Sequence, residues 1–543
     1  MSVHYEDILK RIYGFGTYQM RVMILVSIMQ IVNAFTSYIS NFILGEHRHK
    51  CRIPGFSNQT FDDDGATYNV TQCTYSMNST THSCNSWVYD QSVYTDTLIS
   101  SFNMVCDRKF YRSHLVMAHH VGAFSGMIIT TLFADIFGRK LVFCLSNIGL
   151  FAANIALPWV QNYYVIMFLR YLNGLSGIVS YVSGFILVIE MVKPSKRMIV
   201  GCAISWIYMS GAYILDLIAY FARDWHDLVL YTSAPIGLNL LSWFVIPESP
   251  RWLIVKKKLS KAVKMLNKMA DVNGAKVQYD TDSIACIIDK KHQTSFSKSV
   301  KILITSKQLF IRTCILLFNW FAVNLAYYGI TMNVGKLGGD VYVNVAISVT
   351  VGFLGEIVCL FASYKIGRNR LYMFYMIVGG IGCLLTLLPS LFGQKSLHFL
   401  LVAMFMLGKL TFNGAFLLLY LYTAEVAPTV TRGFFLSLCS GAGKIGSMSS
   451  SYIGDLGLLL DTKFGRALPI IIFGAVGLTA GILCVFLPET KDTILPDTVE
   501  DAAKLGRVVD NNEAEEDLEE RSRDDDNNDF KLLDKKRNDD NKM

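Results

Sequence analysis

Charge is what this sequence has little of. Only 17% of its 543 residues are charged, whereas 52% are apolar, and the mean hydropathy is +0.36. A soluble protein of this length needs far more polar surface to face water. The composition therefore excludes a soluble enzyme core.

Polar stretches between apolar segments are also few. The apolar residues form a dozen segments of about 20 residues, the length that crosses the hydrocarbon core of a bilayer. We therefore predict an all-α, multi-pass membrane protein with twelve transmembrane helices. The predicted spans are 20–44, 114–134, 141–160, 163–189, 198–221, 227–246, 309–332, 341–363, 371–391, 397–423, 433–458 and 467–487.

Known catalytic and targeting patterns are missing. No short apolar run followed by a small-residue cleavage site occurs near the N-terminus, so no cleaved signal peptide is indicated. No zinc-protease, nucleophile-elbow or P-loop pattern occurs in a suitable context, and the GxGxxG letters at 441–446 lack a strand before them. His114, His119 and His120 have no carboxylate or cysteine at ligand spacing, so we predict no metal site. We expect neither an enzyme nor a bound cofactor.

The net charge of +7 hides two opposite regions. Residues 247–308 carry 13 basic and 5 acidic residues, whereas 491–543 carry 10 basic and 18 acidic ones. The excess of basic residues lies between apolar segments, where the positive-inside rule expects it. It therefore indicates membrane topology and not nucleic-acid binding. We predict a plasma-membrane protein with both termini in the cytoplasm. Its parts are a cytoplasmic N-terminus (1–19), an N-terminal half (20–246), a cytoplasmic basic loop (247–308), a C-terminal half (309–487) and an acidic, disordered cytoplasmic tail (488–543).

One polar segment, 45–113, has the composition of an extracellular loop. It holds three Asn-x-Ser/Thr sequons, which predict glycosylation at Asn58, Asn69 and Asn78. It also holds four of the twelve cysteines, Cys51, Cys73, Cys84 and Cys106. We predict up to two disulfides here, and the spacing leaves all three pairings open.

Three signatures repeat at nearly constant offset. Asp135-Ile-Phe-Gly-Arg139 is echoed by Tyr364–Arg368, Glu190 and Arg197 by Glu425 and Arg432, and Pro247-Glu248 by Pro488-Glu489. The repetition predicts two six-helix halves in parallel orientation, the arrangement of a transporter with its site between the halves. We predict that the charges form ion pairs that break and re-form during gating; the alternative is that they only set topology. The predicted gating residues are Asp135, Gly138, Arg139, Glu190, Arg197, Glu248, Arg251, Glu425, Arg432 and Glu489.

Six charged residues lie inside the predicted spans, where charge is costly and usually functional. They are Arg170, Asp216, Glu356, Lys409, Lys444 and Asp455. One interpretation is that they neutralise one another as structural ion pairs. The other is that Glu356 and Lys444, both at mid-span depth, receive the two ends of a zwitterion.

Aromatic residues are abundant at mid-span positions. Rings that face a cavity hold a quaternary ammonium by cation–π attraction, although ordinary packing is the alternative for any single ring. Trp320 and Tyr327 are seven residues apart and therefore share a helix face. The predicted aromatic site residues are Tyr181, Tyr208, Trp320, Tyr327 and Tyr328.

Six motifs occur together along the chain: Gly14-Phe-Gly16, Trp87–Asp90, Asn103–Asp107, Pro247–Leu253, Thr423–Glu425 and Leu487–Thr490. In this combination and order they resemble the organic ion transporters of solute carrier family 22, within the major facilitator superfamily. The resemblance runs over roughly residues 10–500, and residues 33–36, 51–54, 339–344 and 420–425 are similar to the carnitine branch of that family.

The sequence also departs from the pattern of that family. Lys444 stands where the cation transporters carry an aspartate, which argues against a pure cation transporter. Ile136 replaces an arginine, and Tyr364 replaces an acid. The acid that the family usually carries at Gly352 lies one turn on, at Glu356, and Asp216 stands where the family usually has a small neutral residue.

The resemblance implies a secondary transporter that moves a carnitine-like zwitterion or an organic cation across the bilayer by alternating access. An organic anion or polyspecific transporter is the alternative, and a transport-inactive sensor or receptor is the alternative from another class. The implied partners are this small organic ion and a coupling ion. The coupling ion could be either Na⁺ or H⁺, and the sequence does not distinguish them. Lys444 would meet a carboxylate, and Glu356 or Asp216 an ammonium.

Overall fold

The computed structural model describes residues 5–53, 60–61, 69–77, 80–281, 284, 307–337, 339–392, 398–427, 432–459 and 463–491. The sequons at Asn58 and Asn78 and the acidic tail from residue 492 lie outside the described residues. Asn69 and Arg432 are described in their backbone, and their side chains lie outside the description.

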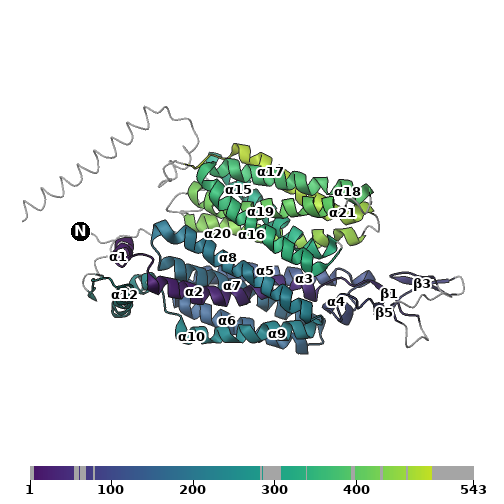
Figure 1. Ribbon diagram of the computed structural model, residues 1–543, viewed down its shortest axis with the longest axis horizontal. Helices are drawn as coiled ribbons and strands as arrows, with labels where there is room; N and C mark the ends of the chain where they lie inside the picture. The colour runs from purple at the N-terminus through teal and green to yellow at the C-terminus, as the bar shows by residue number, and fades with distance from the viewer. Residues whose placement is uncertain are drawn as a thin grey trace, which may run out of the picture.

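Two groups of six long helices lie side by side along the long axis of the molecule (Figure 1). The N-terminal half, below in the view, is purple to teal; the C-terminal half, above, is green to yellow. Most of these helices start and end within about one turn of the predicted spans, because loss of apolar character marks the membrane boundary. The exceptions are α2, α9 and α17, which end six to eight residues early and are continued by short helices. The first half comprises α2 (Thr17–Tyr38), α5 (Tyr111–Phe137), α6 (Arg139–Ala156), α7 (Tyr163–Glu190), α8 (Pro194–Phe221) and α9 (Trp225–Leu238). The second comprises α15 (Lys307–Asn333), α16 (Val341–Lys365), α17 (Arg368–Leu385), α19 (His398–Val426), α20 (Arg432–Asp455) and α21 (Lys463–Leu483).

Eleven helices of the described chain are long and apolar enough to cross a membrane. The remaining long helix, α20, is less apolar because it is rich in glycine and serine and carries Lys444. Short helices continue several spans: α3 (Ser40–Ile43), α10 (Ser242–Val245) and α18 (Leu387–Phe392). The fold is the twelve-helix arrangement predicted from hydropathy.

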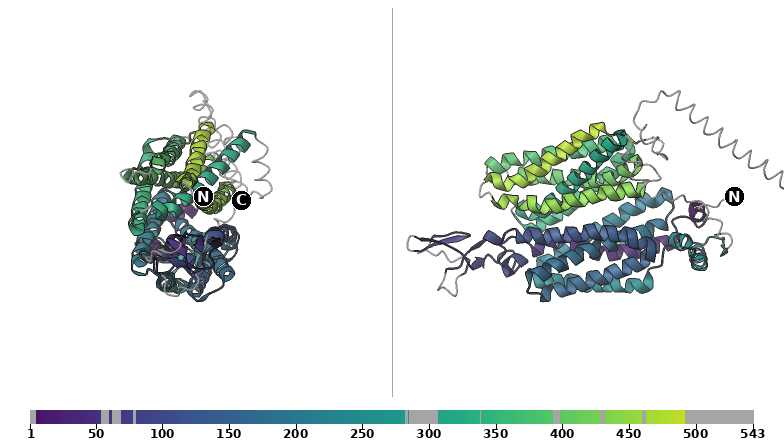
Figure 2. Two further views of the ribbon diagram at one scale, coloured as in Figure 1. Left: turned by 90° about the vertical axis from the view of Figure 1, so that its right-hand side faces the viewer. Right: turned by 180° about the vertical axis from the view of Figure 1, so that it is seen from behind.

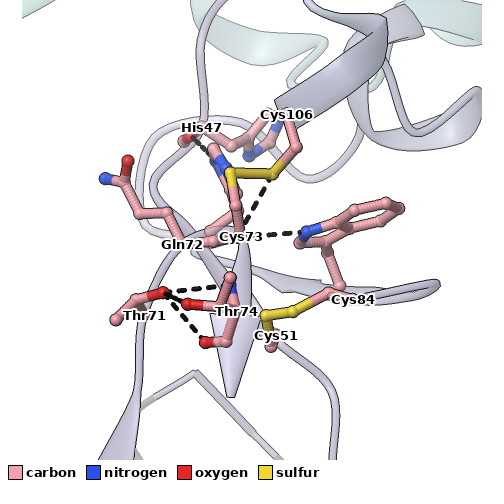
Figure 3. The surroundings of a disulfide bond; sticks show 10 residues. His47, Cys51, Thr71, Gln72, Cys73, Thr74, Cys84 and Cys106 are labelled. Carbon is pink, nitrogen blue, oxygen red and sulfur yellow. Dashed lines mark hydrogen bonds between the residues drawn. A yellow bond between two sulfur atoms is a disulfide. The ribbon is translucent and has the colours of Figure 1, made fainter. Parts of the chain in front are cut away.

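A small subdomain projects from one end of the bundle, which we call the cap end (Figure 1). Its antiparallel strands are β1 (His49–Cys51) with β5 (Trp87–Tyr89), and β2 (Asn69–Val70), β3 (Thr74–Met77) and β4 (Thr80–Ser83) in that order. A short helix, α4 (Leu98–Ser101), begins at Thr97, whose side chain accepts the Ser100 amide. Two disulfides, Cys51–Cys84 and Cys73–Cys106, link the strands to each other and to the start of α5 (Figure 3). One of the three pairings that the sequence left open is thus selected.

The opposite end, which we call the basic-loop end, carries α1 (Tyr5–Arg11), α11 (Pro250–Val255) and α12 (Leu259–Asn273). Figure 2 shows α1 and α12 together, away from the cap. Ile8, Trp252 and Leu266 are buried in one apolar cluster beneath the N-terminal half. The described part of the basic loop is therefore a packed helical layer on that half.

Local sequence explains where the helices begin. Asp340, Asn162 and Asp224 cap α16, α7 and α9 by accepting backbone N–H groups of the first turn. Pro194 opens α8, where its missing N–H costs nothing. Gly138 joins α5 to α6 with a φ of 106°, a conformation that residues with a Cβ rarely adopt.

Glycines set the closest helix contacts in both halves. A Cβ on Gly174 of α7 would overlap the backbone carbonyl of His119 in α5, and one on Gly446 of α20 would overlap that of Phe321 in α15. Small residues let helix backbones approach in a membrane, where van der Waals packing is a main source of association. This packing holds α5 and α20 in place for the site described next.

Candidate substrate site between the two halves

A chain of tyrosine rings crosses from one half to the other. The Tyr181 ring of α7 meets Tyr208 of α8 edge to face at 5.1 Å between centroids, and Tyr208 lies 6.4 Å from Tyr38 of α2. The Tyr38 hydroxyl lies 3.4 Å from that of Tyr327 in α15, whose ring is 5.1 Å from Tyr328. Four of these five residues are predicted site residues: Tyr181, Tyr208, Tyr327 and Tyr328. The structure brings all four together.

A second row of rings supports this aromatic wall from within the C-terminal half. Tyr327 stacks on Phe416 of α19 at 5.1 Å, and Phe416 lies 5.5 Å from Tyr420. Trp320 meets Tyr420 edge to face at 4.5 Å and donates its indole N–H to Thr423 Oγ1 at 2.9 Å. Trp320 is 1% exposed. It therefore braces the wall on the α19 side.

Glu356 of α16 lies where the halves meet on one flank. Its carboxylate accepts from Ser205 of α8, in the other half, at 3.4 Å and from Asn413 Nδ2 of α19 at 3.4 Å. Lys409 of α19 is close enough to interact with it electrostatically. The Lys409 ammonium itself donates to Thr331 Oγ1 at 2.5 Å and lies 4.2 Å from the centre of the Tyr327 ring.

Lys444 of α20 lies on another side of the wall, away from Glu356. Its ammonium is 5.7 Å from the centre of the Tyr328 ring, and His120 of α5 meets the same ring edge to face at 4.9 Å. Glu356 and Lys444 make no direct ion pair in the described chain. The ammonium that lies close to the Glu356 carboxylate is that of Lys409. The Lys444 ammonium lies close to the basic His120 side chain.

Asp216 of α8 lies toward the cap end, apart from the tyrosine wall. It is 8% exposed, and one carboxylate oxygen has no hydrogen-bond partner within the described residues. It interacts electrostatically with Tyr94, Tyr342 and Asp340. The Tyr342 ring closes this region against Phe42 at 5.9 Å and Tyr220 at 5.4 Å. Asp216 is therefore separated from Glu356 and Lys444.

The halves are joined by charge at the cap end. Asp455, the last residue of α20, accepts from Ser113 Oγ at 2.7 Å and from Arg112 at 3.3 Å, both at the start of α5. Arg112 also pairs with Glu46. The Arg112 and Asp455 side chains are 12% and 7% exposed, so the link is shielded from water. These contacts join the two halves at the cap end.

The predicted gating charges of the first half form a network within that half. Arg139 pairs with Asp135 at 2.8 Å and with Glu190 at 3.0 Å, and Ser249 donates to Glu190 at 2.5 Å. Glu248 accepts the backbone N–H groups of Arg139 and Lys140, the first residues of α6. Burial raises the pKa of Glu248, and these N–H groups oppose that rise.

The second half repeats this network. Arg368 pairs with Glu425 at 3.4 Å, and Thr490 donates to Glu425 at 2.6 Å. Glu489 accepts the backbone N–H groups of Asn369 and Arg370 at the start of α17. The sequence repeat is therefore a repeat of hydrogen bonds, with Glu248 and Glu489 each at the positive N-terminal end of a helix.

Two predicted gating residues have other partners. Arg197 pairs with Glu6 of α1 at 3.4 Å and donates to the Val192 carbonyl, so Glu190 has Arg139 and not Arg197 as its ion-pair partner. Arg251 lies close enough to Tyr5 to interact with it electrostatically. Arg197 therefore ties α1 to the first half, and Arg251 lies beside α1 at the basic-loop end.

Comparison with known proteins identifies the family. The family model described as "Sugar (and other) transporter" matches residues 64–499. Mouse solute carrier family 22 member 3 is 32% identical over 410 residues, which cover 76% of this chain and 72% of the relative. The chain belongs to solute carrier family 22. Human organic cation/carnitine transporter 2 is 26% identical over 537 residues (92% of this chain and 94% of the relative), and the organic cation transporter protein of Drosophila melanogaster is 28% identical over 532 residues (93% and 95%).

The fold of this family 22 transporter is also that of solved relatives. The inward open conformation of the xylose transporter XylE from E. coli matches with a TM-score of 0.63 at 13% identity, over 90% of this chain and all of XylE. Its partially occluded inward open conformation gives a TM-score of 0.61 at 15% identity, over 88% of this chain and all of XylE. The likeness establishes the major facilitator fold. The chain is a membrane transporter of the organic cation type and not an enzyme.

Sequence reasoning left several residues of the site in this transporter without a role. Tyr38 and Phe416 complete the wall, yet single aromatic residues in apolar spans carry no signal of their own. Lys409 is recognisable in the sequence as a charge inside a predicted span. Glu356 lies on a different helix, so the sequence does not indicate that the two side chains are close. In the sequence His120 is only one of three neighbouring histidines. Its contact with Tyr328, which places it beside the aromatic wall, is seen only in the structure.

Proposed function

We propose that this transporter moves a small organic ion that carries a quaternary ammonium and a carboxylate, such as carnitine, with organic cations as further substrates. Transport proceeds by alternating access between the halves across the plasma membrane. The observation that carries the proposal is the wall of tyrosine rings with the Glu356 carboxylate on one flank and the Lys444 ammonium on the other.

The chemistry of the wall suits a quaternary ammonium. Such a cation has no N–H to donate, so it is held by aromatic faces and by a carboxylate at a distance. Tyr181, Tyr208, Tyr327 and Tyr328 offer the faces, and Glu356 offers the charge. Lys444 takes the carboxylate at the other end of the substrate. Asp216, nearer the cap end, offers a second acidic position for an ammonium.

The cap end faces the extracellular side and the basic-loop end the cytoplasm. The disulfides Cys51–Cys84 and Cys73–Cys106 form in an oxidising compartment, and glycosylation at the sequons would take place there. The basic loop then lies inside, as the positive-inside rule requires. Hydrogen bonds repeated within each half let each half move as a unit, and the Arg112–Asp455 link is the gate between them.

Uptake into cells tests the proposal. Cells expressing the full chain receive labelled carnitine, tetraethylammonium or an aromatic carboxylate, each with and without sodium and at two external pH values. We expect carnitine to enter fastest, and the sodium and pH arms identify the coupling ion as Na⁺ or H⁺. Uptake of the aromatic carboxylate alone would replace the proposal by an organic anion transporter. No uptake at normal surface expression would favour a ligand sensor.

Two variants test the charge assignment. Lys444→Asp removes the carboxylate partner and adds an acid, so preference should move from carnitine toward tetraethylammonium. Glu356→Gln should lower tetraethylammonium uptake more than aromatic carboxylate uptake. Unchanged selectivity in both variants would mean that neither charge touches the substrate.

A further inference from the structure

A group of basic side chains lies buried where α5 and α20 bring the halves together. Lys444 and His120 share the Tyr328 ring, and the His119 and His120 rings are 5.7 Å apart. Arg170 of α7 and Lys444 both act electrostatically on the two imidazoles. His120, Arg170 and Lys444 are 3%, 1% and 8% exposed. Basic groups from both halves are thus gathered at one buried place.

This group has no acid in it. In the part of the chain that the structure describes, no carboxylate oxygen lies within ion-pair distance of Lys444, Arg170, His119 or His120. Glu356 interacts with Lys409, and Asp455 pairs with Arg112 at the cap end. A buried cation without a counter-ion carries a desolvation cost of several kcal/mol. The charge balance of this region therefore lacks an anion.

Hydrogen-bonding groups of the cluster are also unused. Nε2 of His120, Nδ1 of His119 and Nε of Arg170 are buried and have no partner within the described residues. Another guanidinium nitrogen of Arg170 donates a hydrogen bond to Ser40 Oγ of α3. Unpaired buried polar groups are rare in folded proteins and call for a ligand or water. Here the two histidines interact electrostatically with Lys444, the ammonium that the proposed function assigns to a carboxylate, and with Arg170.

We propose that His119 and His120 of α5 complete an anion subsite with Lys444, backed by the positive charge of Arg170, and that it takes the carboxylate of the substrate. The inference rests on the proposed function and extends it to residues of the N-terminal half. Because α5 and α20 belong to different halves, a carboxylate held by both draws the halves together. Binding of the carboxylate end is thereby tied to closure around the substrate.

Carnitine and choline give the direct test, because both carry a trimethylammonium group and only carnitine has a carboxylate. His120→Leu and His119→Leu should each lower the carnitine-to-choline uptake ratio about tenfold, the effect of losing one hydrogen bond to a charged group. His120→Asn keeps an N–H donor and should recover most of the ratio. His114→Leu, on the same helix but against Tyr111 and Tyr452, is the control and should leave the ratio unchanged. An unchanged ratio in both leucine variants at normal surface expression overturns the inference.

A binding measurement keeps the subsite testable if neither compound is transported. The purified full-length protein is heated in detergent with glycine betaine, butyrate, chloride or choline. Stabilisation by betaine and butyrate that His120→Leu removes supports the subsite even if the proposed transport function fails. Stabilisation by chloride alone assigns the subsite to a free anion and overturns the assignment to the substrate. Lack of stabilisation by any anion overturns the subsite altogether.

Discussion

Removing the charge of Asp455 should open the cap end of the transporter. Asp455 links α20 to α5 through Ser113 at 2.7 Å and Arg112 at 3.3 Å, with both charged side chains largely buried. A hydrogen bond to a charged group contributes about 1.5 to 3 kcal/mol. Asp455→Asn keeps the shape of the side chain and one acceptor but loses the charge. We therefore expect it to destabilise the state closed at the cap end by about 1.5 to 3 kcal/mol. That is roughly a ten- to hundredfold shift toward the state open at the cap end.

Cysteine labelling measures this shift. Ser348 is 3% exposed and lines a small cavity between the halves with Tyr38, Met209 and Lys409. In Ser348→Cys, a membrane-impermeant maleimide added outside should react ten to a hundred times faster when Asp455→Asn is also present. Arg112→Gln should give a similar increase, and the two changes together should not add, because they break the same link.

The control variant is Asp135→Asn, whose ion pair with Arg139 lies within one half and whose side chain is 71% exposed. It should leave the labelling rate of Ser348→Cys unchanged. A rate in Asp455→Asn equal to that of the parent would refute the gate, because the link would then contribute nothing to closure. Equal acceleration by Asp135→Asn would mean that general loosening, and not the gate, is being measured.

Two further predictions concern pairs of residues. Glu356→Gln and Lys409→Met should each lower surface-corrected uptake several-fold, and the double variant should regain protein stability but not tetraethylammonium uptake; full recovery of both would make the pair purely structural. In the cap, Cys73→Ser and Cys106→Ser should reduce surface expression equally and without adding, whereas Cys51→Ser combined with Cys73→Ser should add, since two separate disulfides are lost. Equal additivity in all combinations, read by surface biotinylation, would contradict the pairing.

The charges repeated at the basic-loop end show what can be predicted from the sequence and what cannot. The repeat itself is visible in the sequence, whereas the partners of each charge are visible only in the structure. The offsets between Arg139 and Arg368, Glu190 and Glu425, and Glu248 and Glu489 are readable in the chain. We predict that these charges form ion pairs between helices that break and re-form during gating. The structure shows that they join helices within each half, whereas the ion pair between the halves is formed by Arg112 and Asp455, which no repeat marks. Whether the internal networks also change during transport stays a prediction.

The sequence by itself determined the class, the number and extent of the helices, the two halves and the family. These features follow from apolar length and from repeated motifs, because a bilayer imposes its thickness on every span independently. Only the tertiary structure decided which cysteines pair, that Lys409 and not Lys444 is the neighbour of Glu356, and that His120 joins Lys444 at Tyr328. Those choices depend on the rotation of each helix about its axis and on which helices touch. Both are set by side-chain packing between segments far apart in the chain, which leaves no local pattern to read.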